Sequence, residues 1–138
     1  MPANTSPIFT LIPDIQWSDA MTAANTTKDL TSGTIYLSFT AGANGSYVQR
    51  VRFRTLGTNA AATVGRIWIN NGGATGTASN NTLWDEVSLA ITSGSQTTAL
   101  PVYEVPMNVA LPPSYTIYTT LGTAVAAGYD CIAIGGKY

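Results

Sequence analysis

Histidine is absent from this chain of 138 residues, and cysteine occurs only once. Histidine is the usual proton carrier near neutral pH and a frequent zinc ligand, so the sequence offers neither histidine-based catalysis nor the common metal sites. A single cysteine also excludes an intramolecular disulfide. Because no histidine can activate Cys131, we interpret it as an inert thiol within a strand. The sequence therefore predicts a protein that is not an enzyme and needs no cofactor or metal.

Charge is scarce as well. Asp, Glu, Lys and Arg make up 9% of the residues, against roughly 25% in typical soluble domains. Six basic and seven acidic residues give no basic excess, which a nucleic-acid-binding protein of this size would need. No apolar run is long enough for a membrane-spanning helix, and the N-terminus does not have the pattern of a secretory signal. We expect neither nucleic acid nor a membrane as a partner.

Threonine is abundant instead, with 21 residues, and 13 glycines accompany it. Threonine favours half-buried strands, while glycine and asparagine favour turns. A surface that is polar through Thr, Ser and Asn can be buried against another protein without desolvating many charges. The composition is therefore typical of a protein whose partners are other proteins.

Short segments of alternating apolar and polar residues, separated by turn clusters, predict strands along the whole chain. In the segment 35–40, for example, Ile35, Leu37 and Phe39 are expected to share the buried face. Gly65 is expected to mark a bulge, and Pro106 places its strand at an edge or a bulge. Strands are expected near residues 12–17, 35–40, 46–55, 64–70, 83–91, 102–109, 115–121 and 129–134.

This pattern predicts an all-β fold, an antiparallel β-sandwich of about eight strands that is jelly-roll-like. We expect one domain, in which residues 34–138 form the sandwich core and residues 1–33 form an N-terminal extended arm and the first strand. The segment 17–30 could instead hold a short helix. Prolines in residues 1–13 exclude a helix there, yet Ile8, Phe9 and Leu11 are too apolar to be left in water. We expect this arm to pack outside the sandwich, against a neighbouring subunit.

Arg50, Arg52 and Arg54 hold half of the basic residues of the chain. Their spacing places the three side chains on one face of a strand, about 7 Å apart. They could form a solvated face with ion pairs to Glu86 or Glu104 on adjacent strands. They could also form a subunit contact, or a site for a small anion or nucleic acid.

The three tryptophans are the other candidate contact residues. Trp68 and Trp84 fall opposite the aliphatic positions of their strands, so both are expected to point outward. Outward aromatic side chains are typical of protein contacts, and together with Trp17 they could also form a sugar-stacking platform. We expect Trp68 and Trp84, with the three arginines, Ile8, Phe9 and Leu11, to form the oligomer or partner contacts.

Several segments resemble small structural proteins of tailed bacteriophages, above all head decoration (cement) proteins. The resemblance covers roughly residues 34–138. Its segments are Phe39-Thr40-Ala41-Gly42, Arg50-Val51-Arg52-Phe53, Leu56-Gly57-Thr58-Asn59, residues 66–72, Leu111-Pro112-Pro113-Ser114-Tyr115 and residues 121–129.

This resemblance implies a protein made in the cytoplasm of a bacterial host and located on the surface of the virion head. Proteins of this kind are often trimers on a capsid lattice, so the expected partners are the major capsid protein and further copies of the chain, most simply a homotrimer. An arm such as residues 1–13 would then contact the capsid or a neighbouring subunit. The alternative is a receptor- or glycan-binding module at a tail or fibre tip.

Overall fold

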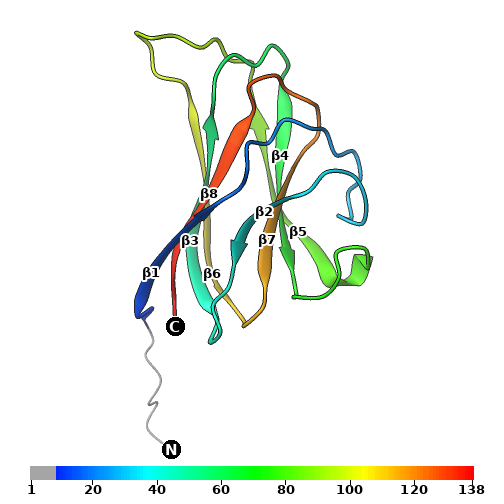
Figure 1. Cartoon of the computed structure of the whole chain (residues 1–138), viewed down its shortest axis with the longest axis vertical. Coiled ribbons are helices and arrows are strands. Elements are labelled where there is room, and N and C mark those ends of the chain that lie inside the picture. Colours follow the sequence, from blue (N-terminus) through cyan, green and yellow to red (C-terminus); the bar gives the residue numbers. More distant parts are fainter. Residues whose placement is uncertain (1–8) are drawn as a thin grey trace, which may run out of the picture.

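The computed structural model describes residues 9–138 of the chain, which form two four-stranded antiparallel sheets (Figure 1). One sheet has the order β1-β8-β3-β6 and the other the order β2-β7-β4-β5. The strands are β1 (Ile12–Trp17), β2 (Tyr36–Thr40), β3 (Ser46–Thr55), β4 (Thr63–Asn70), β5 (Asn81–Leu89), β6 (Val102–Leu111), β7 (Thr116–Leu121) and β8 (Tyr129–Lys137).

Each of the first four strands pairs with one of the last four, in reverse order. β1 pairs with β8, β2 with β7, β3 with β6 and β4 with β5, all antiparallel. The pairs β3–β8 and β4–β7 then join these ladders into two sheets. This is the connectivity of a jelly roll, in which one long antiparallel hairpin is rolled into a sandwich. The predicted all-β antiparallel sandwich is confirmed, and β6, with Pro106, is an edge strand as expected.

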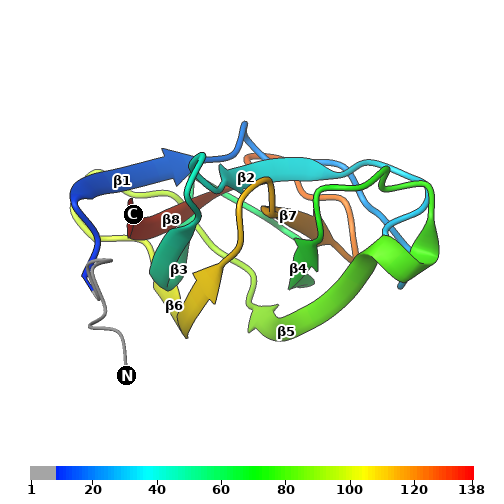
Figure 2. The same cartoon turned by 90° about the horizontal axis from the view of Figure 1, so that it is seen from below.

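The hydrophobic core lies between the two sheets, which Figure 2 shows from below. From Val51 to Thr55 every second side chain of β3 points into it, because alternate residues of a strand face opposite sides of its sheet. A register shift between Val48 and Arg50 interrupts the alternation earlier in the strand. Val51 and Phe53 are fully buried on this inner face, and Ile67 of β4 and Ile117 of β7 meet them from the other sheet. The intervening residues point outward, and they form the surfaces described below.

The strand β2 departs from simple alternation. The register between β2 and β7 shifts between Leu37 and Phe39, so Ser38 is buried and its hydroxyl lies 2.8 Å from that of Thr119. Leu37 is exposed. The prediction that Leu37 shares the buried face with Phe39 is therefore wrong, because a bulge changes which side chains face inward.

The bulge expected at Gly65 is also displaced. The register between β4 and β5 shifts between Ile67 and Trp68 instead. Gly65 has a packing role: a Cβ at this position would lie 2.9 Å from the ring of Phe53. The glycine therefore leaves room for a core aromatic ring from the opposite sheet.

Residues 18–35 contain no helix and form an irregular segment (Figure 1). It begins along β8, where Met21 is buried in the core, and from Ala24 onward it lies over the sheet β2-β7-β4-β5. Isolated bridges of Met21 to Tyr129 and of Ala24 to Leu121 attach the segment to the sandwich. We call residues 18–35 the cover segment. Within residues 9–138 no helix is long and apolar enough to cross a membrane.

Candidate protein-binding face

The outer face of the sheet β1-β8-β3-β6 brings together residues from four strands in two rows. Because residues paired across strands point to the same side of a sheet, the pairing register defines the rows. The first row is Trp17, Ile132, Arg52 and Glu104, and the second is Ile15, Ile134, Arg50 and Pro106. We call these eight residues, together with Arg54, the open face.

The half of the open face on β1 and β8 is apolar. Ile15 and Trp17 are 56% and 66% exposed, and Ile132 and Ile134 beside them are half-buried. Leu11 continues the same alternation toward the N-terminus and is exposed too. Contiguous apolar surface of this kind marks an interaction site more often than isolated exposed residues do.

The other side of β1 carries the polar residues, which explains why its apolar side chains point to solvent. Gln16 accepts a hydrogen bond from the backbone N–H of Thr40 in β2 and donates one to its carbonyl, each at 2.9 Å. Asp14 lies 3.6 Å from the Lys137 ammonium. The Gln16 hydrogen bonds join the edge of one sheet to the edge of the other, whereas the Asp14 contact lies within the first sheet. The alternation of the strand then leaves Ile15 and Trp17 outside.

The half of the open face on β3 and β6 is charged. Arg52 donates to the Glu104 carboxylate through Nε, at 2.8 Å, and through Nη2. This hydrogen bonding lowers the pKa of Glu104 below its ordinary value. Arg54 donates to the Leu100 carbonyl at 2.8 Å. The expected ion pair with Glu104 is therefore present, whereas Glu86 lies in the other sheet.

Arg50 is the least compensated of the three arginines. Its Nε is buried without a hydrogen-bond partner among residues 9–138 and lies 3.9 Å from the Glu104 oxygen that Arg52 already engages. A shallow cavity of about 260 Å³ borders it, lined also by Gln49, Glu104, Pro106 and Asn108. The Glu104 carboxylate thus pairs with two guanidinium groups, and the Arg50 guanidinium can bind a further carboxylate.

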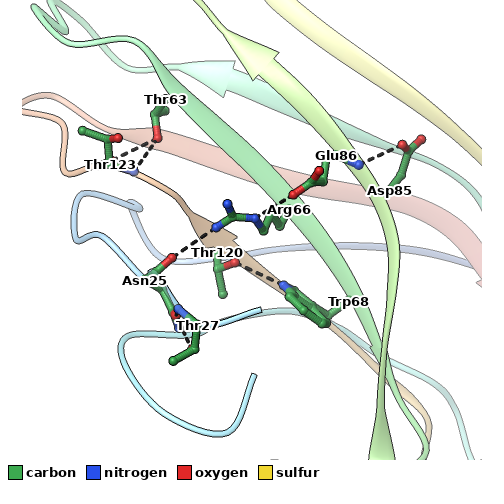
Figure 3. Close-up of polar contacts among 9 residues, drawn as sticks. All are labelled: Asn25, Thr27, Thr63, Arg66, Trp68, Asp85, Glu86, Thr120 and Thr123. Atoms are coloured by element: carbon green, nitrogen blue, oxygen red, sulfur yellow. Dashed lines mark hydrogen bonds and ion pairs between the residues drawn. The ribbon is translucent and has the colours of Figure 1, made fainter. Parts of the chain in front are cut away.

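The outer face of the other sheet is covered. Trp68 is 2% exposed, and its Nε1 donates to the Thr120 hydroxyl at 3.1 Å. Buried Arg66 donates through Nε to Glu86 at 2.8 Å and through Nη1 to the Asn25 carbonyl of the cover segment at 3.2 Å (Figure 3). The prediction of Trp68 as an outward contact residue is therefore wrong. Its side chain leaves the aliphatic face as expected, but the chain itself covers it.

Trp84 is 41% exposed and lies on β5, an edge strand of the covered sheet. It occupies the bulge, because Leu83 pairs with Trp68 and Asp85 pairs with Ile67. The two exposed tryptophans, Trp17 and Trp84, thus belong to different sheets and form no common platform for a sugar. Of the predicted arm residues, Phe9 and Leu11 are exposed, and Ile8 lies outside the described residues.

The interior carries little reactive chemistry. Cys131 is fully buried on the inner face of β8, and this burial raises the pKa of its thiol to about 12. A thiol of this kind is not a nucleophile at neutral pH. Within residues 9–138 no group of three His, Cys, Asp or Glu residues lies close enough to hold a metal ion.

Sequence reasoning missed part of the open face. Ile15, Ile132 and Ile134 were not singled out, and Trp17 was considered only as part of a sugar platform. A signal was present: Phe9, Leu11, Pro13, Ile15 and Trp17 occupy every second position of one continuous segment. That spacing identifies one face of a strand, although it does not say whether that face is buried.

No family model matches the chain, and no curated protein does. Two solved structures of infectious bursal disease virus show a distant likeness. For the Gt strain the TM-score is 0.30 at 17% identity, over 98% of this chain and 36% of that chain. For the Gx strain the TM-score is 0.28 at 15% identity, over 99% and 37%. The chain thus spans little more than a third of the length of either viral chain.

Proposed function

We propose that this protein is a non-enzymatic structural component of a virus particle, a decoration or cement protein that binds the surface of a phage head and stabilises it. The observation that carries the proposal is the open face, where exposed apolar side chains adjoin an under-compensated arginine on a sheet surface. Such a surface is suited to contact with another protein, because apolar area gives affinity and charge gives orientation. Its expected partners are the major capsid protein and further copies of the chain, as a homotrimer.

The jelly-roll connectivity limits the classes of protein function to be considered. Jelly rolls occur in viral capsid proteins, in lectins and in cupins. Imidazole ligands suit iron, copper and zinc sites, and this chain has no histidine to supply them. A protein-binding or sugar-binding role is then left for the exposed residues.

The surroundings of Trp17 favour protein over sugar. Its neighbours in the open face are Ile15 and Ile132, which offer no hydrogen-bonding group to a sugar hydroxyl. A lectin site combines an aromatic ring with a few well-placed polar groups. An aromatic residue among aliphatic ones, with arginines at the border, is instead typical of the centre of a protein interface.

A glycan-binding role at a tail or fibre tip is the second candidate, and one cavity favours it. This cavity of about 190 Å³ is lined by Asn71, Asn80, Asn81 and Tyr115, among others. The amide groups are engaged, however: Asn80 donates to the Ala74 carbonyl at 3.0 Å and Asn81 to the Thr75 carbonyl at 2.8 Å. A sugar would have to compete with these loop contacts.

Immunogold labelling of purified particles of the virus that encodes the chain tests the proposal. Antibodies raised against the folded protein are expected to label the whole head surface, and particles lacking the protein are expected to lose their genome at a lower temperature. Gold confined to the tail tip, with binding on a glycan array, would instead support the second candidate. Particles without any label would refute both.

A further inference from the structure

Two exposed tryptophans lie in surroundings that complement each other. Trp17 stands on β1 in the apolar half of the open face, and β8 separates it from β3, which carries Arg50. Trp84 stands on β5 between exposed Leu83 and Asp85. We call Leu83–Asp85 the β5 knob. One surface thus offers apolar area with a positive charge, and the other offers apolar area with a negative charge.

Neither Arg50 nor Asp85 has an ion-pair partner to itself, because Arg50 shares the Glu104 oxygen, 3.9 Å from its Nε, with Arg52. Glu86 is engaged by Arg66, Glu104 by Arg52 and Asp14 by Lys137. Asp85 forms no ion pair with any of residues 9–138, and the hydrogen bond that its carboxylate accepts there comes from the backbone N–H of Glu86, at 2.8 Å. Among the carboxylates of the strands, Asp85 and Asp130 form no ion pair within residues 9–138. Asp130 lies on β8 beside Arg54 in the pairing register, so Asp85 is the one of the two that lies away from the open face and can meet a guanidinium there on another molecule.

The bulge at Trp84 favours side-chain contact over strand addition. Edge strands expose unpaired backbone groups that can pair with another chain, and a bulge interrupts that edge and redirects a side chain. In β5 the bulge lies within the knob itself. The knob is thus suited to insert side chains into a partner surface.

A two-fold contact of the open face with itself would leave Arg50 without a further carboxylate. With the two-fold axis across the strands, β3 of one copy would lie over β3 of the next and oppose arginine to arginine, which is unfavourable in an interface. With the axis along β1 and β8, the apolar halves would match, but β3 of each copy would lie outside the contact. The knob supplies both an apolar side chain and a carboxylate.

We propose that copies of this chain associate head to tail, with the β5 knob of one copy seated on the open face of the next and Asp85 paired with Arg50. Trp84, next to Asp85, then covers the apolar side chains of β1 and β8. Because the contact joins two different surfaces, it closes into a ring if the rotation allows. The inference rests on the self-association in the proposed function and assigns residues to it.

Charge exchange between Arg50 and Asp85 tests this contact in the full chain. Light scattering at micromolar concentration is expected to give an oligomer for the unchanged protein, about threefold the 14.4 kDa of the monomer. R50E and D85R should each reduce the mass to that of the monomer, and the double variant R50E/D85R should restore the oligomer. K28E, at an exposed position in the cover segment, is the matched control and should leave the mass unchanged.

Circular dichroism identifies any variant that fails to fold, and W17S and W84S then provide a second measurement. Both should lower the mass without a change of net charge. A monomeric unchanged protein would overturn the head-to-tail contact while leaving head labelling unaffected, so the two proposals fail separately. An oligomer that survives both single charge reversals would also overturn it, as would a double variant that stays monomeric while the control associates.

Discussion

The two outer faces of the sandwich carry the same kinds of residue, but one face is buried and the other is exposed. Each places a tryptophan and an arginine at outward positions: Trp68 and Arg66 on one sheet, Trp17 and Arg50 on the other. The first two are buried beneath the cover segment, and the last two are left at the surface. The comparison shows that the pattern within a strand determines the side to which a residue points, while a distant segment determines whether that side meets water.

The cover segment is held in place by its own hydrogen bonds. The buried Asn25 amide donates to the carbonyls of Ser32 and Thr34, and its oxygen accepts from Thr27. Gly33 adopts a positive φ of 80°, and a Cβ there would lie 2.9 Å from the Asn25 side chain. A segment without regular secondary structure can thus cover a sheet face, because one side chain satisfies several of its backbone groups. The open face has no such cover within residues 9–138.

Replacing the two tryptophans should give the largest difference between the faces. Trp68→Ala removes a buried ring and leaves the Thr120 hydroxyl without its donor, so unfolding free energy should fall by about 3–5 kcal/mol. Trp17→Ala should change it by less than about 0.5 kcal/mol, because the side chain is already in water. Urea unfolding at low protein concentration, where self-association contributes little, measures both. Equal losses would mean that the cover segment does not exclude water from Trp68.

Replacing Arg66 and Arg54 should give the same difference in unfolding free energy between the two faces, with a smaller magnitude. Arg66→Ala leaves the buried Asn25 carbonyl without a donor and should lower the unfolding free energy by about 2 kcal/mol. Arg54→Ala on the open face loses one partly exposed contact and should cost less than about 1 kcal/mol. The same urea titrations measure both values. A larger loss for Arg54 than for Arg66 would contradict the assignment of buried and open faces.

The smallest expected effect concerns pH. The hydrogen bond from Arg52 holds the pKa of Glu104 below its ordinary value of 4.5, so the folded state favours the ionised carboxylate. The stability that this pair contributes is present above pH 4.5 and is lost as pH falls through the lower folded-state pKa. NMR titration of Glu104 should give a depressed midpoint that returns toward 4.5 in Arg52→Gln. An unchanged midpoint in this variant would show that Arg52 does not cause the shift.

The strands could be predicted from the sequence because their signal is local. The expected segments 46–55 and 12–17 coincide with β3 and β1, since alternation and turn residues are both encoded within ten residues. The face of Leu37 could not be predicted, because a bulge depends on how β2 meets β7. The burial of Trp68 could not be predicted either, since it depends on a cover segment some forty residues earlier in the chain.

The open face likewise contains residues that could be predicted from the local sequence and residues that could not. The shared face of Arg50, Arg52 and Arg54 was predicted from their spacing. Glu104, their ion-pair partner, was one of the two carboxylates named for that role. The other, Glu86, pairs with Arg66 because β5 belongs to the second sheet, which the sequence does not specify. Ile132 and Ile134 joined the face only once the register placed β8 between β1 and β3.

The pairing of the first strand with the last also determines when the molecule can fold. β1 begins at Ile12, and its partner β8 ends at Lys137, so nearly the whole chain must be synthesised before this ladder can form. At about 5–20 residues per second, the wait is on the order of ten seconds. During that time the apolar residues of β1 have no native neighbour. Sandwiches dominated by such distant pairings are slow folders, so the newly made chain should depend on the speed of closure, or on chaperones, to avoid aggregation.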